Sequence, residues 1–196
     1  MDVLTGLKSE IFRPAITFII PGILAGTPYF FVLEYFYSDL SKHVTDHPTL
    51  STFLSAVVST AFGLIAYELG TSIENNRIDV ALKKADPLFE DEWYKYLRCT
   101  FPVPPVAEDY IHNQILFLKF ELSAVAALLI SFPGTFLAWF LQGHPGYMSS
   151  AIVAASFMFG IRYFYKEAES SAKILARVRK EILKGVGCPP SCEPEP

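Results

Sequence analysis

The chain has 196 residues, of which 52% are hydrophobic and 18% are charged, and its formal net charge at pH 7 is −4. Soluble domains carry about 25% charged residues, so the composition argues against an ordinary soluble protein, and the acidic balance argues against nucleic acid as a partner. Three cysteines are too few, and odd in number, for a disulfide-stabilised secreted fold.

A long uncharged stretch follows a short polar arm at residues 1–13. Residues 14–33 read PAITFIIPGILAGTPYFFVL and contain no Asp, Glu, Lys, Arg or His. About 20 apolar residues are enough for an α-helix to cross the ~30 Å hydrocarbon core of a bilayer. The run is also longer than the apolar core of a signal peptide. We therefore expect a first transmembrane helix at 14–37 that stays in the mature protein.

This first helix contains both a breaking and a packing signal. Pro21 and Gly22 fall near its middle, where a proline removes a backbone hydrogen bond and makes a hinge. Gly22 and Gly26 are four residues apart, which provides a flat face for close contact with another helix. The helix is therefore expected to bend and to pack tightly.

The second span is expected at 50–70, so that residues 14–70 form a first transmembrane hairpin. It carries the small residues Ser55, Ser59 and Gly63 at intervals of four. Such a stripe predicts close helix packing, and a pore lining is the alternative interpretation.

Residues 71–114 are polar and predict a cytoplasmic helical segment between the two hairpins. Asp86 and Pro87 are typical of a helix start, since aspartate caps free N–H groups and proline needs none. Apolar side chains then recur on one helical face. The members of this face are Phe89, Trp93, Tyr96 and Leu97. They form a candidate docking surface for a cytosolic protein partner.

A second hairpin is expected at 115–165. Its spans are 119–141 and 147–165. Pro133 and Gly134 interrupt the first of these and predict a second hinge. The return span is rich in small residues, including Ser156 and Gly160, which favour close helix packing.

Residues 166–186 continue the last span as a basic amphipathic helix, with an apolar stripe that includes Ile174, Val178 and Ile182. Its cations make it a candidate for binding anionic lipid. Its stripe could instead pair with a second copy of the chain. Residues 187–196 are expected to be a disordered tail.

The distribution of Lys and Arg predicts the orientation. Four spans place both termini on one side, and 15 of the 16 Lys and Arg residues then fall on that side, Lys42 being the exception. The positive-inside rule puts that side in the cytoplasm. The expected fold is an all-α polytopic membrane protein with four transmembrane helices in two hairpins and cytoplasmic helical extensions, in a plasma membrane or bacterial inner membrane.

Ionisable residues at the cytoplasmic ends of the spans form the candidate polar site. They are Glu68, Lys119, Glu121 and Arg162. Ionisable groups in membranes usually pair with one another or face a water-filled cavity. An ion-pair girdle that fixes helix register is the favoured interpretation, and the charged mouth of a pathway is the alternative.

The predicted outer loops contain the candidate metal ligands His43, His47 and His144, because imidazole is a common zinc ligand. Their loop positions favour solvated side chains instead. No metal or cofactor is expected. The sequence lacks phosphate-loop, dinucleotide-binding, zinc-protease and serine-hydrolase motifs.

Three hypotheses of function follow. The first is a homo-oligomer that forms or gates a channel or pore under the control of its cytoplasmic helices, because small-residue faces and mid-span breaks are frequent. The second is a non-conducting membrane anchor or adaptor for a cytosolic partner. The third is a membrane enzyme acting on lipid or quinone, with Glu68, His112, Glu121 or Arg162 at its site; it has the least support, because no pair of these residues has a diagnostic spacing.

Overall fold

The computed structural model describes residues 15–37, 39, 42, 44, 46–98, 108–143 and 146–186. All regular structure in these residues is helical, which confirms the all-α prediction. The elements are the π-helix η1 (Ala15–Ile19), α2 (Ile20–Phe36), α4 (Pro48–Ile73), the π-helix η2 (Glu74–Ile78), α5 (Asp79–Ala85), α6 (Phe89–Arg98), α7 (Glu108–Leu141) and α8 (Tyr147–Val186). The predicted arm at 1–13 and tail at 187–196 lie outside the described residues.

Three helical stretches in the described part of the chain are long and apolar enough to cross a membrane. They are Thr17–Phe36, Pro48–Ala85 and Tyr110–Leu141. Each contains most or all of one of the first three predicted spans. The first half of α8 is not among them; its uncharged stretch ends at Ile161, and Arg162 follows. By length and composition, the chain therefore has helices of the membrane-crossing kind.

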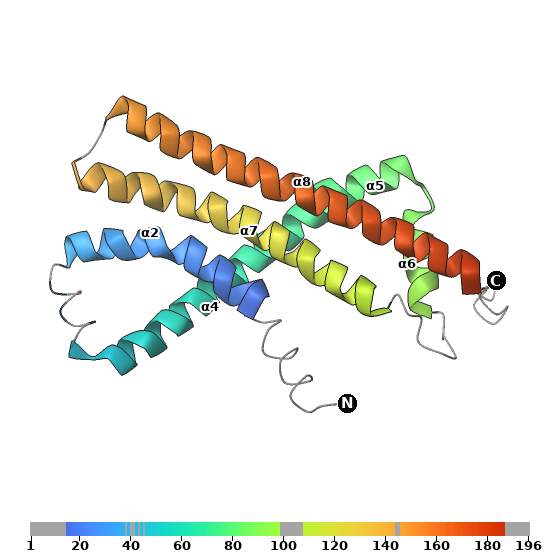
Figure 1. Ribbon diagram of the computed structural model, residues 1–196, viewed down its shortest axis with the longest axis horizontal. Helices are drawn as coiled ribbons and strands as arrows, with labels where there is room; N and C mark the ends of the chain where they lie inside the picture. The colour runs from blue at the N-terminus through green and yellow to red at the C-terminus, as the bar shows by residue number, and fades with distance from the viewer. Residues whose placement is uncertain are drawn as a thin grey trace.

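The central helix of the molecule is α7, which packs against α8 on one side and against α2 and α4 on others. Figure 1 shows α8 running beside α7, while α4 crosses behind α2 and α7. The end of α2, the start of α4, the end of α7 and the start of α8 lie at the left end of Figure 1, and α5, α6 and the end of α8 lie at the right end. The α2–α4 and α7–α8 pairs are thus two antiparallel helix pairs.

The two ends of this bundle differ in composition. The apolar half contains α2, the first part of α4, the second part of α7 and the first part of α8, and it exposes large side chains such as Phe53, Phe140 and Phe159. The charged half contains η2, α5, α6, the start of α7 and the end of α8.

Each half has its own core. In the apolar half, α2, α4 and α7 meet at four fully buried alanines: Ala25, Ala66, Ala126 and Ala127. Small side chains let helices approach closely. In the charged half, large aliphatic side chains together with two alanines join α7, α8 and the continuation of α4: Ile78, Ile111, Leu118, Leu122, Ala168, Ala172 and Leu175. This second core resembles that of a water-soluble helical bundle.

Long helices connect the two halves. The η2 turn and α5 continue α4, so one helical stretch runs from Pro48 to Ala85. The 40 residues of α8 form one helix, about 60 Å long at 1.5 Å per residue. Between α7 and α8, Gly143 has a φ of 72°, the left-handed conformation that glycine adopts without strain at the end of a helix.

Candidate functional site

The closest helix contact lies between the η1–α2 segment and α4. A Cβ atom on Gly22 would lie 1.7 Å from the Ser59 carbonyl oxygen, and one on Gly63 would lie 1.9 Å from the Phe18 carbonyl oxygen. No side chain fits at either glycine, so the two backbones are in direct contact. The structure therefore places three of the predicted packing residues, Gly22, Ser59 and Gly63, at one crossing.

The other predicted packing residues have looser surroundings. A Cβ on Gly26 would meet the Phe62 ring at 3.2 Å, and one on Gly160 would meet Leu128 Cδ1 at the same distance. Ser55 is exposed on α4. Ser156 is exposed on α8, and its hydroxyl donates a hydrogen bond to the Ile152 carbonyl of the same helix at 2.9 Å. These two hydroxyls lie on surfaces that no other helix of the described chain covers.

The two predicted hinges occupy different positions. Pro21 lies at the start of α2, directly after the π-helical turn, whereas Pro133 lies inside α7. A Cβ on Gly134 would come within 3.0 Å of the Tyr29 ring. The Tyr29 hydroxyl donates a hydrogen bond to the Ile130 carbonyl at 2.8 Å. This bond ties α2 to α7 one turn before the proline, where the backbone hydrogen-bond ladder is incomplete.

The four charged residues of the predicted girdle do not form one group. Lys119 Nζ lies 2.6 Å from Glu74 Oε2, in a largely buried ion pair between α7 and η2. The same ammonium stands 5.6 Å from the Tyr67 ring centroid. Glu121 faces Ser171 across the α7–α8 contact. Glu68 and Arg162 are exposed, and neither forms an ion pair within the described residues.

The candidate metal ligands are not assembled in the described part of the chain. His43 and His144 lie outside the described residues, and His47 is exposed beside the first residue of α4. His112 is exposed on α7. Among the described residues, no group of three or more His, Cys, Asp or Glu side chains could hold a metal ion.

The short helix α6 is attached to α8 by two consecutive cations. The Arg179 guanidinium carbon lies 4.3 Å from the Trp93 ring centroid and 5.1 Å from that of Phe89. Such cation–π contacts contribute about 0.5–2 kcal/mol, most when water is excluded. Lys180 Nζ lies 2.9 Å from Asp86 Oδ2 and 3.3 Å from Glu92 Oε1. We call these contacts the α6 clamp.

The α6 clamp also shifts the acid–base properties of its charged members. The hydrogen bond from Lys180, and then that from the Leu88 N–H, lowers the pKa of Asp86 below its ordinary value. Hydrogen bonds to Asp86 and Glu92 raise the pKa of Lys180. Both groups are therefore held in their charged forms across the neutral range.

The predicted partner-docking face of α6 is turned mainly toward the chain itself. Phe89 and Trp93 stack against Arg179, and Tyr96 packs against the core of the charged half. Leu97 is 58% exposed. The neighbouring α6 residue Tyr94 is also exposed. An external partner would therefore meet only the edge of the predicted surface.

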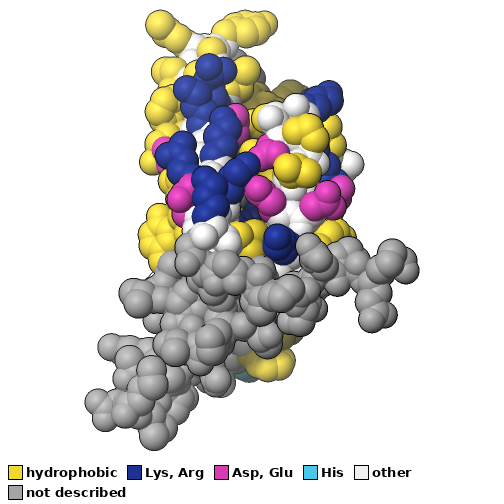
Figure 2. Space-filling view, turned by 90° about the vertical axis from the view of Figure 1, so that its right-hand side faces the viewer, with side chains coloured by type: hydrophobic (Ala, Val, Ile, Leu, Met, Phe, Trp, Pro, Cys, Tyr) yellow, Lys and Arg dark blue, Asp and Glu magenta, His cyan; other side chains and the backbone are white. Residues whose placement is uncertain are grey.

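Most of the apolar stripe of residues 166–186 likewise packs inside the molecule, with Leu175 rather than Ile174 in the core. Leu175, Val178 and Ile182 belong to the core of the charged half. The cations on the opposite face of α8 remain exposed, including Lys173 and Arg177. Figure 2 shows a column of Lys and Arg side chains on the surface of the charged half, with acidic side chains beside it.

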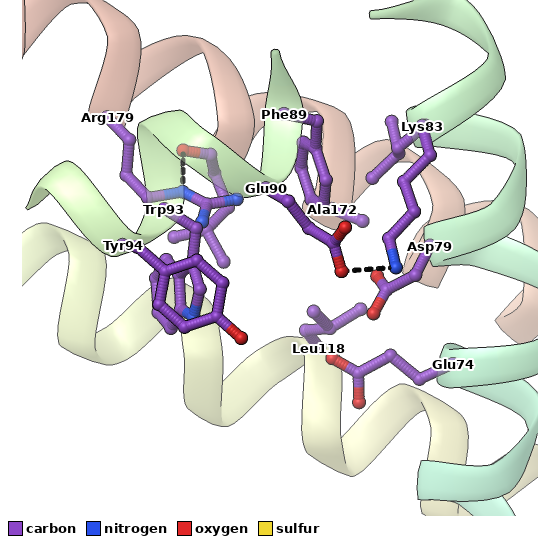
Figure 3. A pocket seen from close by; sticks show the side chains of 12 residues that line it. Glu74, Asp79, Lys83, Phe89, Glu90, Trp93, Tyr94, Leu118, Ala172 and Arg179 are labelled. Carbon is purple, nitrogen blue, oxygen red and sulfur yellow. Dashed lines mark hydrogen bonds and ion pairs between the residues drawn. The ribbon is translucent and has the colours of Figure 1, made fainter. Parts of the chain in front are cut away.

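A cavity of about 270 Å³ lies under α6. Its walls come from η2, α5, α6, α7 and α8, and Figure 3 shows the side chains around it. Aromatic and apolar groups alternate there with charges: Glu74, Asp79, Leu82, Lys83, Phe89, Glu90, Trp93, Tyr94, Leu118, Ala172, Leu175 and Arg179. Concave sites with a few placed charges are the usual form of small-molecule pockets.

Most of the charges around this cavity are paired. Glu74 is bound by Lys119 at 2.6 Å, and Glu90 is bound by Lys83 at 2.5 Å. Arg179 is only 6% exposed, and burial lowers its pKa. Burial, and then repulsion by Glu74, raises the pKa of Asp79, which lies beyond the apolar part of the α4 helix.

Sequence reasoning missed Arg179, Lys180, Asp79 and Glu74. For Arg179 a signal exists: it follows Ala172 and Leu175 at spacings of seven and four, which places it on the buried face of α8. Lys180 and Glu74 have no comparable signal, because their partners lie on other helices, and Asp79 has none, because other helices enclose the cavity that it lines. No family model, curated protein or solved structure matches this chain.

Proposed function

We propose that the chain is an integral membrane protein in which α8 provides a fourth span. Two observations support this: α8 runs beside α7, and its first part exposes large apolar side chains such as Ile152 and Phe159. The 15 uncharged residues from Tyr147 to Ile161 cover about 22 Å. Arg162 then extends to the interface, as long cationic side chains do. The charged half lies in the cytoplasm, in agreement with the positive-inside rule.

We infer that several copies assemble to form or gate a pore. The carrying observation is the closed core of the apolar half, where Ala25, Ala66, Ala126 and Ala127 fill the space between α2, α4 and α7. A path for ions would therefore lie between copies. Hydroxyl and small side chains remain on outer surfaces that a second copy could cover, including an open groove of about 430 Å³ between α2 and α4 that Ser55 and Ser59 line.

The charged half is the natural control element of such a pore. The α4–α5 stretch, α7 and α8 all run from the apolar half into the charged half without interruption. A rearrangement around α6 would therefore reach the membrane through helices and not through loops. This coupling supports a gate that responds to events in the cytoplasm.

The experiment combines a mass measurement with a flux measurement. The protein in nanodiscs is expected to give a particle mass of more than one chain, and liposomes that contain it are expected to release a trapped ion. Ser55→Leu, in the α2–α4 groove, is expected to change assembly or flux, whereas Phe53→Leu on the lipid-facing surface of the same helix is the control. A monomer that leaves the liposomes tight would contradict the proposal.

The membrane adaptor is the second candidate, and the exposed apolar side chains on and before α6, Leu88, Tyr94 and Leu97, favour it. It predicts tight liposomes together with a defined cytosolic partner whose binding is lost in Leu97→Asp. Asp91→Asn, which keeps these apolar groups and lies on the exposed face of α6, is the control. Flux through the purified protein alone would argue against this candidate.

A further inference from the structure

Two opposite charges around the cavity under α6 lack a direct charged partner. Glu74 forms an ion pair with Lys119, and Glu90 forms one with Lys83. Asp79 has neither an ion pair nor a hydrogen bond from its side chain within the described residues. Arg179 bonds only through Nε, which donates to the Leu175 carbonyl at 3.3 Å. No carboxylate of the described residues forms an ion pair with this guanidinium, although the side chain is only 6% exposed.

Arg179 is unusual because its charge is buried while no ion pair within the described residues neutralises it. A buried polar group without a partner costs free energy, and a buried charge costs more. The rings of Trp93 and Phe89 compensate one face of the guanidinium, but they accept no directed hydrogen bond at its edge. Figure 3 shows this side chain among the groups that surround the cavity. A planar fork of N–H donors matches a carboxylate or a phosphate.

Asp79 provides the complementary charge. It is half-buried on α5 and lines the same cavity. Its carboxylate and the Arg179 guanidinium are close enough to influence each other electrostatically. A carboxylate in this position would accept hydrogen bonds from an ammonium group. The wall of the same cavity also includes the apolar side chains Leu118 and Leu175.

We propose that this cavity binds a small zwitterion of the amino-acid type. Its anionic group binds the guanidinium edge of Arg179, its ammonium group binds Asp79, and its apolar part contacts Leu118 and Leu175. The volume of about 270 Å³ corresponds to roughly nine water molecules at about 30 Å³ each, which suits a compact ligand. This binding does not require the chain to conduct ions, so a failed flux experiment leaves the inference intact.

The test uses the full chain in nanodiscs and Trp93 as the reporter. The sequence has two tryptophans, so Trp139→Phe leaves Trp93 as the sole emitter, directly at the cavity. The probes are L-leucine, 4-methylpentanoate, which lacks the amine, and 3-methylbutylamine, which lacks the carboxylate. L-Leucine is expected to change the Trp93 emission with saturation. Each single-charge analogue is expected to bind about tenfold more weakly or worse, since it loses one charge-assisted contact.

Two variants assign the contacts. Asp79→Asn is expected to lower the affinity for L-leucine about tenfold or more while leaving the affinity for 4-methylpentanoate unchanged. Asp91→Asn, on the exposed face of α6, is the matched control. Arg179→Lys keeps the positive charge but removes the planar fork of N–H donors. It is expected to lower the affinities for L-leucine and for 4-methylpentanoate by the same factor. Circular dichroism and the ligand-free Trp93 emission show whether each variant is folded.

Three outcomes would overturn the inference. They are equal binding of 4-methylpentanoate and L-leucine, an unchanged L-leucine affinity in Asp79→Asn, and a Trp93 emission that does not respond to L-leucine in the folded protein.

Discussion

Single glycines set the distance between the helices of the apolar half. A methyl group at Gly22 would overlap the Ser59 carbonyl, and one at Gly63 would overlap the Phe18 carbonyl. Backbone atoms cannot rotate away as a side chain does, so both contacts are intolerant of any added atom. Gly26 differs, because its nearest neighbour is the Phe62 ring, which can turn.

The first prediction compares these two kinds of glycine. Gly22→Ala is expected to destabilise the protein by about 3 kcal/mol, at the upper end of overpacking effects, because α2 and α4 must separate. Gly26→Ala is the control and is expected to cost less than about 1 kcal/mol. Unfolding in mixed detergent micelles, followed by circular dichroism, measures both. Equal effects would show that the crossing is not as close as described.

The second prediction concerns the hydrogen bond between Tyr29 and the Ile130 carbonyl. Tyr29→Phe removes the hydroxyl while keeping the ring against Gly134, so it is expected to cost about 1 kcal/mol, the net value of one hydrogen bond. Tyr35→Phe, at an exposed position on the same helix, is expected to have no effect. The same unfolding assay distinguishes the two, and a neutral Tyr29→Phe would mean that water replaces the bond.

The spacing of small residues could be read from the sequence, but their contacts could not. Gly22 and Gly26 are four residues apart on one helix, as Ser59 and Gly63 are on the next, which is the signal for close packing. Nothing local indicates that Gly63 meets the backbone of Phe18, because the crossing angle of two helices depends on all the side chains between them. Lys119 illustrates the same limit: its partner Glu74 lies 45 residues away on a π-helical turn.

At the scale of elements, α6 depends on α8 for its position. The sequence predicts a helix start at Asp86 and Pro87 and an amphipathic pattern after it; the helix itself begins slightly later, at Phe89. The surface that covers it comes from Arg179 and Lys180, more than 80 residues later. An exposed docking face and a face packed within the chain have the same sequence pattern, so the pattern alone could not decide between them.

The third prediction tests the attachment of α6. Lys180→Gln removes the cation that joins Asp86 and Glu92, so hydrogen exchange of the α6 amides is expected to accelerate several-fold. Lys173→Gln is the matched control, because Lys173 pairs only with Glu169 of its own helix. An α6 that exchanges equally in both variants would show that its aromatic contacts hold it without the ion pairs.

The α6 clamp also has a defined dependence on pH. Asp86 has a lowered pKa, so its contribution is complete above its ordinary value of 3.8 and is lost as the pH falls through the lower value of the folded state. Lys180 has a raised pKa, so its contribution persists until the pH rises past 10.5. Between these limits the exchange protection of α6, relative to Lys180→Gln at the same pH, is expected to stay constant.

At the scale of the whole molecule, the division into an apolar and a charged half is the basis of the orientation that we propose. The end of α2 and the start of α4 lie at one end of the molecule with the end of α7 and the start of α8, and the core of the charged half lies at the other. The all-helical architecture and three membrane-crossing helices could be predicted, because length and hydropathy are local properties. The fourth span could not be predicted in the same way, because the uncharged part of α8 ends at Ile161 and is shorter than a full membrane crossing.

The fourth prediction concerns this orientation. In a variant without Cys99, Cys188 and Cys192, Asp46→Cys is expected to react with a membrane-impermeant maleimide in intact cells. Lys173→Cys is expected to react only after the cells are permeabilised, since the positive-inside rule places it in the cytoplasm. The reverse labelling pattern would show that the topology is the opposite of the one proposed. Labelling of both cysteines from outside the cell would show that α8 does not cross the membrane.

The uninterrupted course of α8 has a mechanical consequence. A helix of 40 residues behaves as a stiff rod, because bending it requires many backbone hydrogen bonds to lengthen together. A tilt of about 5° about one end of a rod of about 60 Å displaces the other end by roughly 5 Å. Arg179 and Lys180 lie near one tip of this lever, and Tyr147 lies at the other. A change of contacts at α6 could therefore swing the far tip through the width of a side chain.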